Sequence, residues 1–288
     1  MSEVRHLAIG GLRIAIRCDD PRVSCRFHET TSRFLTDGGE TSDVELTVRA
    51  MDATVSRDGE LAFDAGPWQL FRTAGGFRFQ CSSENVGREP YKIATFNESF
   101  TRGEVAIRTE AVGDVVDPLE YPLDEVLVGH LLGRGRGVEI HGCGLVDRDG
   151  RGHLFAGQSG AGKTTTARLW EGEEVNILSD DRIIIREVDA QMRIFGSPWH
   201  GEAELSSPAS APLANIFLLT QATETALREI PASEAIARLF SCAFPPFHDA
   251  DALAFTVGFL ERVVTAVPVR ELRFTRDRSA IDIVRNTR

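Results

Sequence analysis

The sequence lacks the features that mark disulfide-stabilised or membrane-spanning chains. Its five cysteines are scattered and form no C-x-x-C pair, which argues against a disulfide framework and against a structural zinc site. No segment approaches the roughly 18 uninterrupted apolar residues that a membrane-spanning helix requires. The first residues show no long apolar core followed by a small-residue cleavage site. We therefore expect a soluble cytoplasmic chain with no membrane partner.

Basic residues are also in deficit. The chain has 32 lysines and arginines against 43 aspartates and glutamates, which gives a net charge of −11. Such a charge opposes a broad surface that would track the phosphates of DNA or RNA. Nucleic acid is therefore not expected as a partner, while a homo-oligomer stays open.

The spacing of apolar residues along the sequence changes near Pro118. From about residue 7 to 108, short apolar or alternating runs are separated by Gly, Asp, Asn and Pro, a pattern typical of strands and turns. After Pro118, apolar residues recur at helical spacing until Gly133 interrupts the run. We expect a β-rich N-terminal domain at 1–117 and an α/β domain at 118–288.

The α/β part contains a glycine-rich motif of the form G-x-x-x-x-G-K-[ST], the Walker A pattern. A strand-like run, HLFAG, leads into it and a helix-like run, TTARLWEGE, follows, which is the order that a P-loop requires. The expected nucleotide-binding residues are Gly157, Gln158, Ser159, Gly160, Ala161, Gly162, Lys163, Thr164 and Thr165.

This motif predicts a site for ATP and Mg²⁺. Glycines allow successive backbone N–H groups to point at phosphates, and the following helix adds the positive end of its dipole. Lys163 would reach the outer phosphates, and the hydroxyl of Thr164 would ligate Mg²⁺. The alternative is a chance glycine-rich turn with a surface lysine.

Two adjacent acids, Asp180 and Asp181, lie between apolar runs that end at Leu178 and begin at Ile183. Carboxylates in a buried strand region are unusual unless they serve a site. A phosphate loop needs an acid for the metal and a group that takes a hydroxyl proton. The alternative is a β-turn whose acids face water.

The segment EIHGCGLVDRDGRGHLFAGQSGAGKTTTARLWEGEEVNILSDD resembles the catalytic core of HPr kinase/phosphorylase. The resemblance spans about 138–186 and includes the interval from Thr164 to Asp180 and the histidine at His141. It implies the nucleotide-binding fold that this family shares with ATP-dependent phosphoenolpyruvate carboxykinase, here with a β-rich N-terminal domain. The signature loop that contacts HPr in that family has no counterpart, so the resemblance does not specify HPr as acceptor.

Carried over by position, the resemblance implies three roles. Asp180 would be the catalytic base, Asp181 the acid on the magnesium side together with Thr164, and His141 the group that orients Asp180. Lys163 would complete the catalytic set. From the residues alone, a lone histidine on an apolar strand is more often a core residue.

Further downstream, the run from Gly196 to Glu202 contains Trp199 and His200 between two strand-like segments. It is equally compatible with a loop over the nucleotide or acceptor and with a rigid turn. Three arginines near the acidic pair could neutralise transferred phosphate or be solvated strand residues: Arg182, Arg186 and Arg193.

Two functions follow from these features. The first is a kinase, a transferase that moves the γ-phosphoryl group of ATP to a hydroxyl, such as serine, of a peptide, protein or small molecule. The second is a non-catalytic ATP-binding regulatory or scaffold protein whose β-rich domain engages a partner. The acidic pair favours the first.

Overall fold

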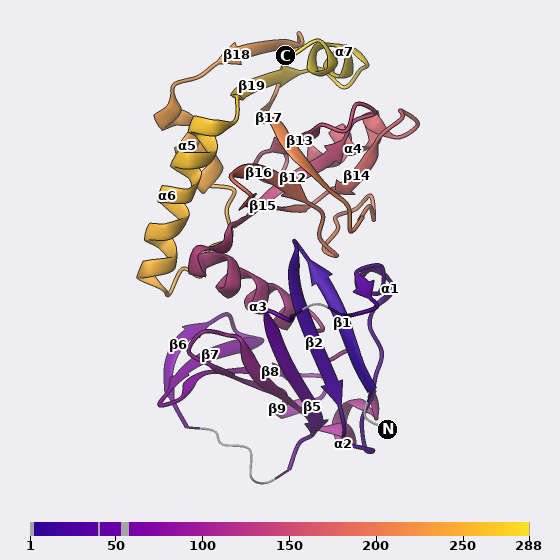
Figure 1. The fold of residues 1–288 in the computed structure, drawn as a ribbon, viewed down its shortest axis with the longest axis vertical. Helices are drawn as coiled ribbons and strands as arrows, with labels where there is room; N and C mark the ends of the chain where they lie inside the picture. The colour runs from indigo at the N-terminus through magenta and orange to yellow at the C-terminus, as the bar shows by residue number, and fades with distance from the viewer. Residues whose placement is uncertain (1–2, 40, 53–57, 288) are drawn as a thin grey trace. The chain divides into compact units, whose positions relative to one another are not determined.

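The computed structural model describes residues 3–39, 41–52 and 58–287 and is a mixed α/β structure with two large sheets. It divides into two compact units, Met1–Leu131 and Leu132–Arg288 (Figure 1). Within the described ranges, no helix is both long enough and apolar enough to cross a membrane.

The first unit is built on a nine-stranded sheet, with the strand order β4-β1-β2-β5-β10-β9-β8-β7-β6. A two-stranded sheet pairs β3 with β11. The elements are β1 (Glu3–Ile9), β2 (Leu12–Cys18), β3 (Ser24–Cys25), α1 (Glu29–Ser32), β4 (Leu35–Thr36), β5 (Val44–Ala50), β6 (Glu60–Asp64), β7 (Trp68–Thr73), β8 (Gly76–Ser83), β9 (Gly87–Asn97), β10 (Arg102–Ile107), α2 (Thr109–Val112), β11 (Val115–Val116) and α3 (Leu123–Leu131).

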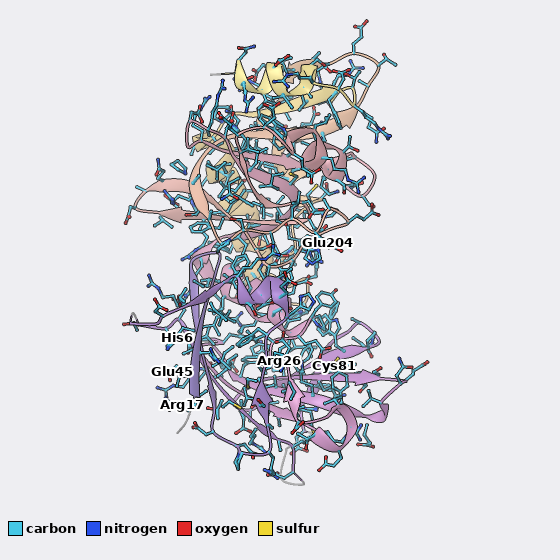
Figure 2. The ribbon with its side chains drawn as sticks, turned by 90° about the vertical axis from the view of Figure 1, so that its right-hand side faces the viewer. His6, Arg17, Arg26, Glu45, Cys81 and Glu204 are labelled. Atoms are coloured by element: carbon cyan, nitrogen blue, oxygen red, sulfur yellow. The ribbon has the colours of Figure 1, made fainter. Side chains whose placement is uncertain are left out.

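Alternation of buried and exposed residues explains these strands. In β2 the apolar Ile14 and Ile16 are buried while Arg17 is exposed, and in β5 Leu46 is buried while Glu45 is exposed. Successive side chains of a strand point to opposite faces, so the apolar set lies on one face of the sheet. Figure 2 labels Arg17 and Glu45 on these two paired strands. The described residues of this unit are mostly strands.

Helix α3 belongs to the first unit. Its His130 stacks on Phe100 with ring centroids 4.3 Å apart and lies 5.9 Å from the ring of Phe77. The sequence placed this helix in the second domain, with a boundary between residues 117 and 118, whereas the structure divides after it. All residues of the helix except Glu125 are buried, and helical spacing in the sequence does not tell which sheet the helix will cover.

The second unit contains an eight-stranded sheet in which β13, β17 and β19 lie side by side in that order and run parallel to one another. Antiparallel strands complete it, and β14 pairs with β12. The strands are β12 (Val138–Val146), β13 (Gly152–Ala156), β14 (Asn176–Ser179), β15 (Arg182–Val188), β16 (Gln191–Phe195), β17 (Ser210–Gln221), β18 (Ala226–Glu229) and β19 (Val269–Phe274).

Helices cover both faces of this sheet because its central strands are apolar on both sides. In β13, Leu154 belongs to one core and its neighbour Phe155 to the other. The first core contains residues of α5 and α6, and the second contains residues of α4 and α7. The helical elements are η1 (Leu132–Arg136), a kinked turn, α4 (Lys163–Trp170), α5 (Ala232–Phe240), α6 (Ala250–Ala266) and α7 (Ser279–Arg285).

A buried histidine in β13 predicts a pH-dependent stability. His153 is 0% exposed, neither ring nitrogen has a hydrogen-bond partner among the described residues, and burial lowers its pKa from 6.5 to about 4. As the pH falls below 6.5, His153 binds a proton in the unfolded chain but stays neutral in the folded chain. Folding stability is therefore lost between pH 6.5 and 4, by about 3 kcal/mol for this group.

The substitution His153→Leu removes this proton uptake. We expect the free energy of unfolding, measured by urea denaturation, to rise by about 1–3 kcal/mol at pH 7, because two unpartnered nitrogens leave the core. The gap between variant and original chain should widen from pH 7 to pH 5. Parallel stability curves over this range would contradict the assignment.

Candidate functional site

The glycine-rich segment connects β13 to α4, as the sequence predicted. The strand ends at Ala156 and the helix begins at Lys163. Two glycines make the loop possible. A Cβ on Gly157 would lie 2.6 Å from the Cβ of Ala161, and a Cβ on Gly162, which has φ +110°, would lie 2.5 Å from the ring of Phe274. Side chains larger than hydrogen are therefore excluded from both positions.

The other residues predicted to bind nucleotide lie in the same short segment. Gln158, Ser159 and Gly160 are exposed, and the carbonyl of Gly160 accepts a hydrogen bond of 2.7 Å from the amide of Gln221. Ala161, Thr164 and Thr165 are half-buried. Because Thr164 and Thr165 stand in the first turn of α4, their N–H groups lack acceptors within the helix. This end of α4 is an anion-attracting position.

Lys163 is buried against its own loop. Its ammonium donates hydrogen bonds to the carbonyls of Gly157 (2.9 Å) and Gln158 (3.0 Å). Burial lowers the pKa of Lys163, and the negative charge of Asp181 opposes that shift. The lysine is therefore within electrostatic reach of Asp181, which lies just beyond the end of β14.

The first acid, Asp180, is a structural carboxylate. It is 1% exposed and accepts hydrogen bonds from three backbone N–H groups: Gly201 (2.9 Å), Ala203 (2.9 Å) and Leu205 (3.4 Å). Both of its oxygens are engaged. Asp180 was expected to be the catalytic base; the structure encloses its carboxylate among these backbone donors, and its role in proton transfer stays a prediction.

The second acid, Asp181, is the accessible one, with a side chain that is 27% exposed. Its Oδ1 lies 3.2 Å from Nδ1 of His141, and its Oδ2 lies 3.3 Å from Nε of Arg182. The hydrogen bond with His141 is the largest influence that holds the pKa of Asp181 below its ordinary value. His141 was expected to orient Asp180. In the structure the histidine contacts Asp181, the neighbouring acid.

The turn that carries the two acids is fixed by serines. Ser179 Oγ donates to the carbonyl of Trp199 (2.7 Å) and accepts from the backbone N–H of Asp181 (3.1 Å). Ser197 Oγ donates to the carbonyl of Arg182 (2.6 Å). These bonds tie the acidic turn to the loop that follows β16, where Glu204 is labelled in Figure 2.

This loop includes the Pro-Trp-His-Gly run, for which the sequence allowed either a ligand-covering loop or a rigid turn. Its main chain surrounds Asp180, and Trp199 is 9% exposed. The turn interpretation fits the buried tryptophan. His200 is half-buried and Glu202 is exposed, so both stand on the loop as polar groups.

The three arginines near the acids have structural partners. Arg182 contacts Glu139 (3.1 Å) and lies over the ring of Phe244. Arg186 donates to the carbonyl of Arg136 (3.1 Å), and Arg193 donates to Ser210 (3.0 Å).

A cavity of about 330 Å³ opens beside the start of the loop. It falls in the size range of small-molecule sites. Its lining residues come from β13, the loop, β17 and the end of α5: Ala156, Gly157, Gln158, Ala161, Leu218, Leu219, Arg238, Ser241 and Cys242. The last three were missed from the sequence, where they stand in an ordinary amphipathic helix and the turn after it.

Comparison with known proteins adds little. No family model and no curated protein matches the chain. One solved structure that it resembles is the Hpr(Ser) kinase/phosphatase from Coxiella burnetii, with 14% identity, coverage of 44% of this chain and 92% of that chain, and a TM-score of 0.21. A likeness of this degree carries no conclusion about activity.

Proposed function

We propose that this chain binds ATP with Mg²⁺ at 157–165 and transfers the γ-phosphoryl group to a hydroxyl of a peptide, protein or small molecule. One observation carries the proposal. The lysine of a complete G-x-x-x-x-G-K-T loop lies at the start of α4, and main-chain hydrogen bonds link the loop to the acidic turn through β12: Gly157 N–H donates to the carbonyl of His141 (3.5 Å), and Gly142 N–H donates to the carbonyl of Asp181 (2.8 Å). This link supports a single site that contains the phosphate-binding loop and the acid.

The donor set suits magnesium. Mg²⁺ in phosphoryl-transfer sites takes one or two carboxylates and hydroxyls, with the remaining positions filled by phosphates and water. The accessible carboxylate of Asp181 and the half-buried Thr164 would supply such ligands. In the described ranges, no three His, Cys, Asp or Glu side chains gather into a metal cluster. When bound, Mg²⁺ would neutralise charge on the outer phosphates.

His141 is the group in this site that can accept a proton. Its Nδ1 faces both Oδ1 (3.2 Å) and the carbonyl oxygen (3.1 Å) of Asp181. Two acceptors at Nδ1 favour the tautomer that carries the proton there, which leaves Nε2 to take the hydroxyl proton of the acceptor. The side chain of His141 is 24% exposed, so an acceptor can approach it. In this scheme Asp181 orients His141 and Asp180 supports the turn.

Lys163 and the helix terminus supply the electrostatic part. The ammonium would leave the loop carbonyls for the outer phosphates, where negative charge accumulates during transfer. Most of the rate enhancement in phosphoryl transfer comes from such positioning and charge neutralisation.

Titration calorimetry of the purified chain tests the proposal. We expect Mg-ATP to bind one site per chain with a dissociation constant between about 1 µM and 1 mM. ADP should form faster when a hydroxyl acceptor is added. The absence of heat with either ATP or ADP in the presence of Mg²⁺ would overturn the proposal, while binding without acceptor-dependent ADP formation would favour a scaffold function.

A further inference from the structure

The cavity beside the loop contains one charged lining side chain, Arg238 of α5. The other lining groups are apolar, small or uncharged polar residues. A guanidinium that borders a phosphate-binding loop is suited to a phosphate oxygen, because its planar set of N–H groups matches the geometry of phosphate.

Another residue of the cavity lining, Cys242, is subject to the positive charges of both Lys163 and Arg238. Burial raises the pKa of the Cys242 thiol, and the positive charges of Lys163 and Arg238 both oppose that rise. Cys242 therefore stands within electrostatic reach of both cations. Cys242 lines the same cavity as Arg238, and the ammonium of Lys163 is bonded to the carbonyls of two other lining residues, Gly157 and Gln158.

Hydrogen bonds to neighbouring side chains hold the guanidinium of Arg238 in place. Its Nη1 donates to Glu271 (2.8 Å) and Glu234 (3.4 Å), and its Nη2 donates to Thr220 (3.2 Å). Burial acts to raise the pKa of Glu271, but hydrogen bonds from Arg228 and Arg238 lower it to about 2. Glu271 thus stays ionised and anchors Arg238 at neutral pH.

These bonds leave donors for a ligand. A guanidinium carries five N–H groups. Among the described residues, the three hydrogen bonds of Arg238 use both N–H groups of Nη1 and one of Nη2. The Nε–H and the second N–H of Nη2 are left. Two donors from one guanidinium are what a phosphate accepts in the bidentate mode.

We infer that Arg238 binds the terminal phosphate of the nucleotide. This inference rests on the proposed function and names a contact that the motif does not contain. The cavity borders Gly157 and Gln158, whose carbonyls hold the ammonium of Lys163. Since that lysine serves the outer phosphates, Arg238 meets the γ-phosphate and distinguishes ATP from ADP.

The test compares two arginines that share one carboxylate. Arg228 also contacts Glu271 (2.8 Å) and Glu234 (3.0 Å), but it does not line the cavity. Calorimetry with ADP and with the β,γ-imido analogue of ATP, both with Mg²⁺, is carried out on the original chain, Arg238→Gln and Arg228→Gln. Arg238→Gln should weaken binding of the analogue about tenfold and leave ADP binding within about twofold. Arg228→Gln should leave both unchanged.

Three results would overturn the inference: unchanged binding of the analogue to Arg238→Gln, an equal loss for both nucleotides, or the same loss in Arg228→Gln. If circular dichroism shows Arg238→Gln unfolded, Arg238→Lys replaces it, and unaltered binding of the analogue to that variant has the same meaning. An original chain that binds neither nucleotide refutes the proposed function and the inference with it. Binding by the original chain and unaltered binding by the variant refute the inference alone.

Discussion

The substitution Lys163→Ala is expected to weaken the affinity for Mg-ATP about a hundredfold, with ADP affected in the same direction. The ammonium now bonded to Gly157 and Gln158 would no longer be available for the outer phosphates. Loss of a charge-assisted contact inside a buried site corresponds to about 3 kcal/mol, which is a factor of about one hundred in affinity. Titration calorimetry measures the change directly.

A control is available on the same helix. Arg168 is exposed in the last turn of α4, so Arg168→Ala removes a positive charge without touching the loop. Its nucleotide affinity should match that of the original chain within about twofold, since exposed charges contribute little. Equal losses in the two variants would show that net charge, and not the loop contact, governs binding.

The second large effect concerns the accessible acid. Asp181→Asn should reduce the rate of ADP formation, measured with water as acceptor, about a thousandfold. The amide weakens the magnesium site and no longer holds His141 through a negatively charged oxygen. ATP affinity should fall much less than the rate, because Lys163 and the loop remain.

The neighbouring acid supplies the contrast. In Asp180→Asn, the side-chain NH₂ replaces an oxygen that accepts a backbone N–H from the loop at 201–205. A buried N–H without an acceptor costs about 1–3 kcal/mol, so thermal or urea unfolding should show the loss. A variant with full stability and no ADP formation would instead restore Asp180 as the base.

Much of the fold follows from periodicity. The alternating runs before residue 108 became strands, and the run with helical spacing after Pro118 became the helix Leu123–Leu131. The boundary between the two units was harder to predict from the sequence. The helix Leu123–Leu131 is buried except at Glu125, and its association with the first sheet includes contacts of His130 with Phe77 and Phe100, which lie far away in sequence.

The candidate site also has parts that the sequence could identify and parts that it could not. The loop at 157–165 and the two acids could be identified from short motifs, because their geometry is encoded by neighbours along the chain. The partner of His141 could not, because Asp180 and Asp181 are adjacent and the direction of each carboxylate depends on the turn that Ser179 and Ser197 hold.

The sequence by itself determined a strand, a phosphate-type loop and a helix in that order, since glycine conformation and helix initiation are local properties. Only the tertiary structure decided which acid is enclosed, which acid faces His141 and which arginine lines the cavity beside the loop. Arg238 lies in a helix that is remote in sequence, and its position is set by packing of α5 against the sheet and by Glu271 on β19. Such contacts join distant segments, and no local pattern records them.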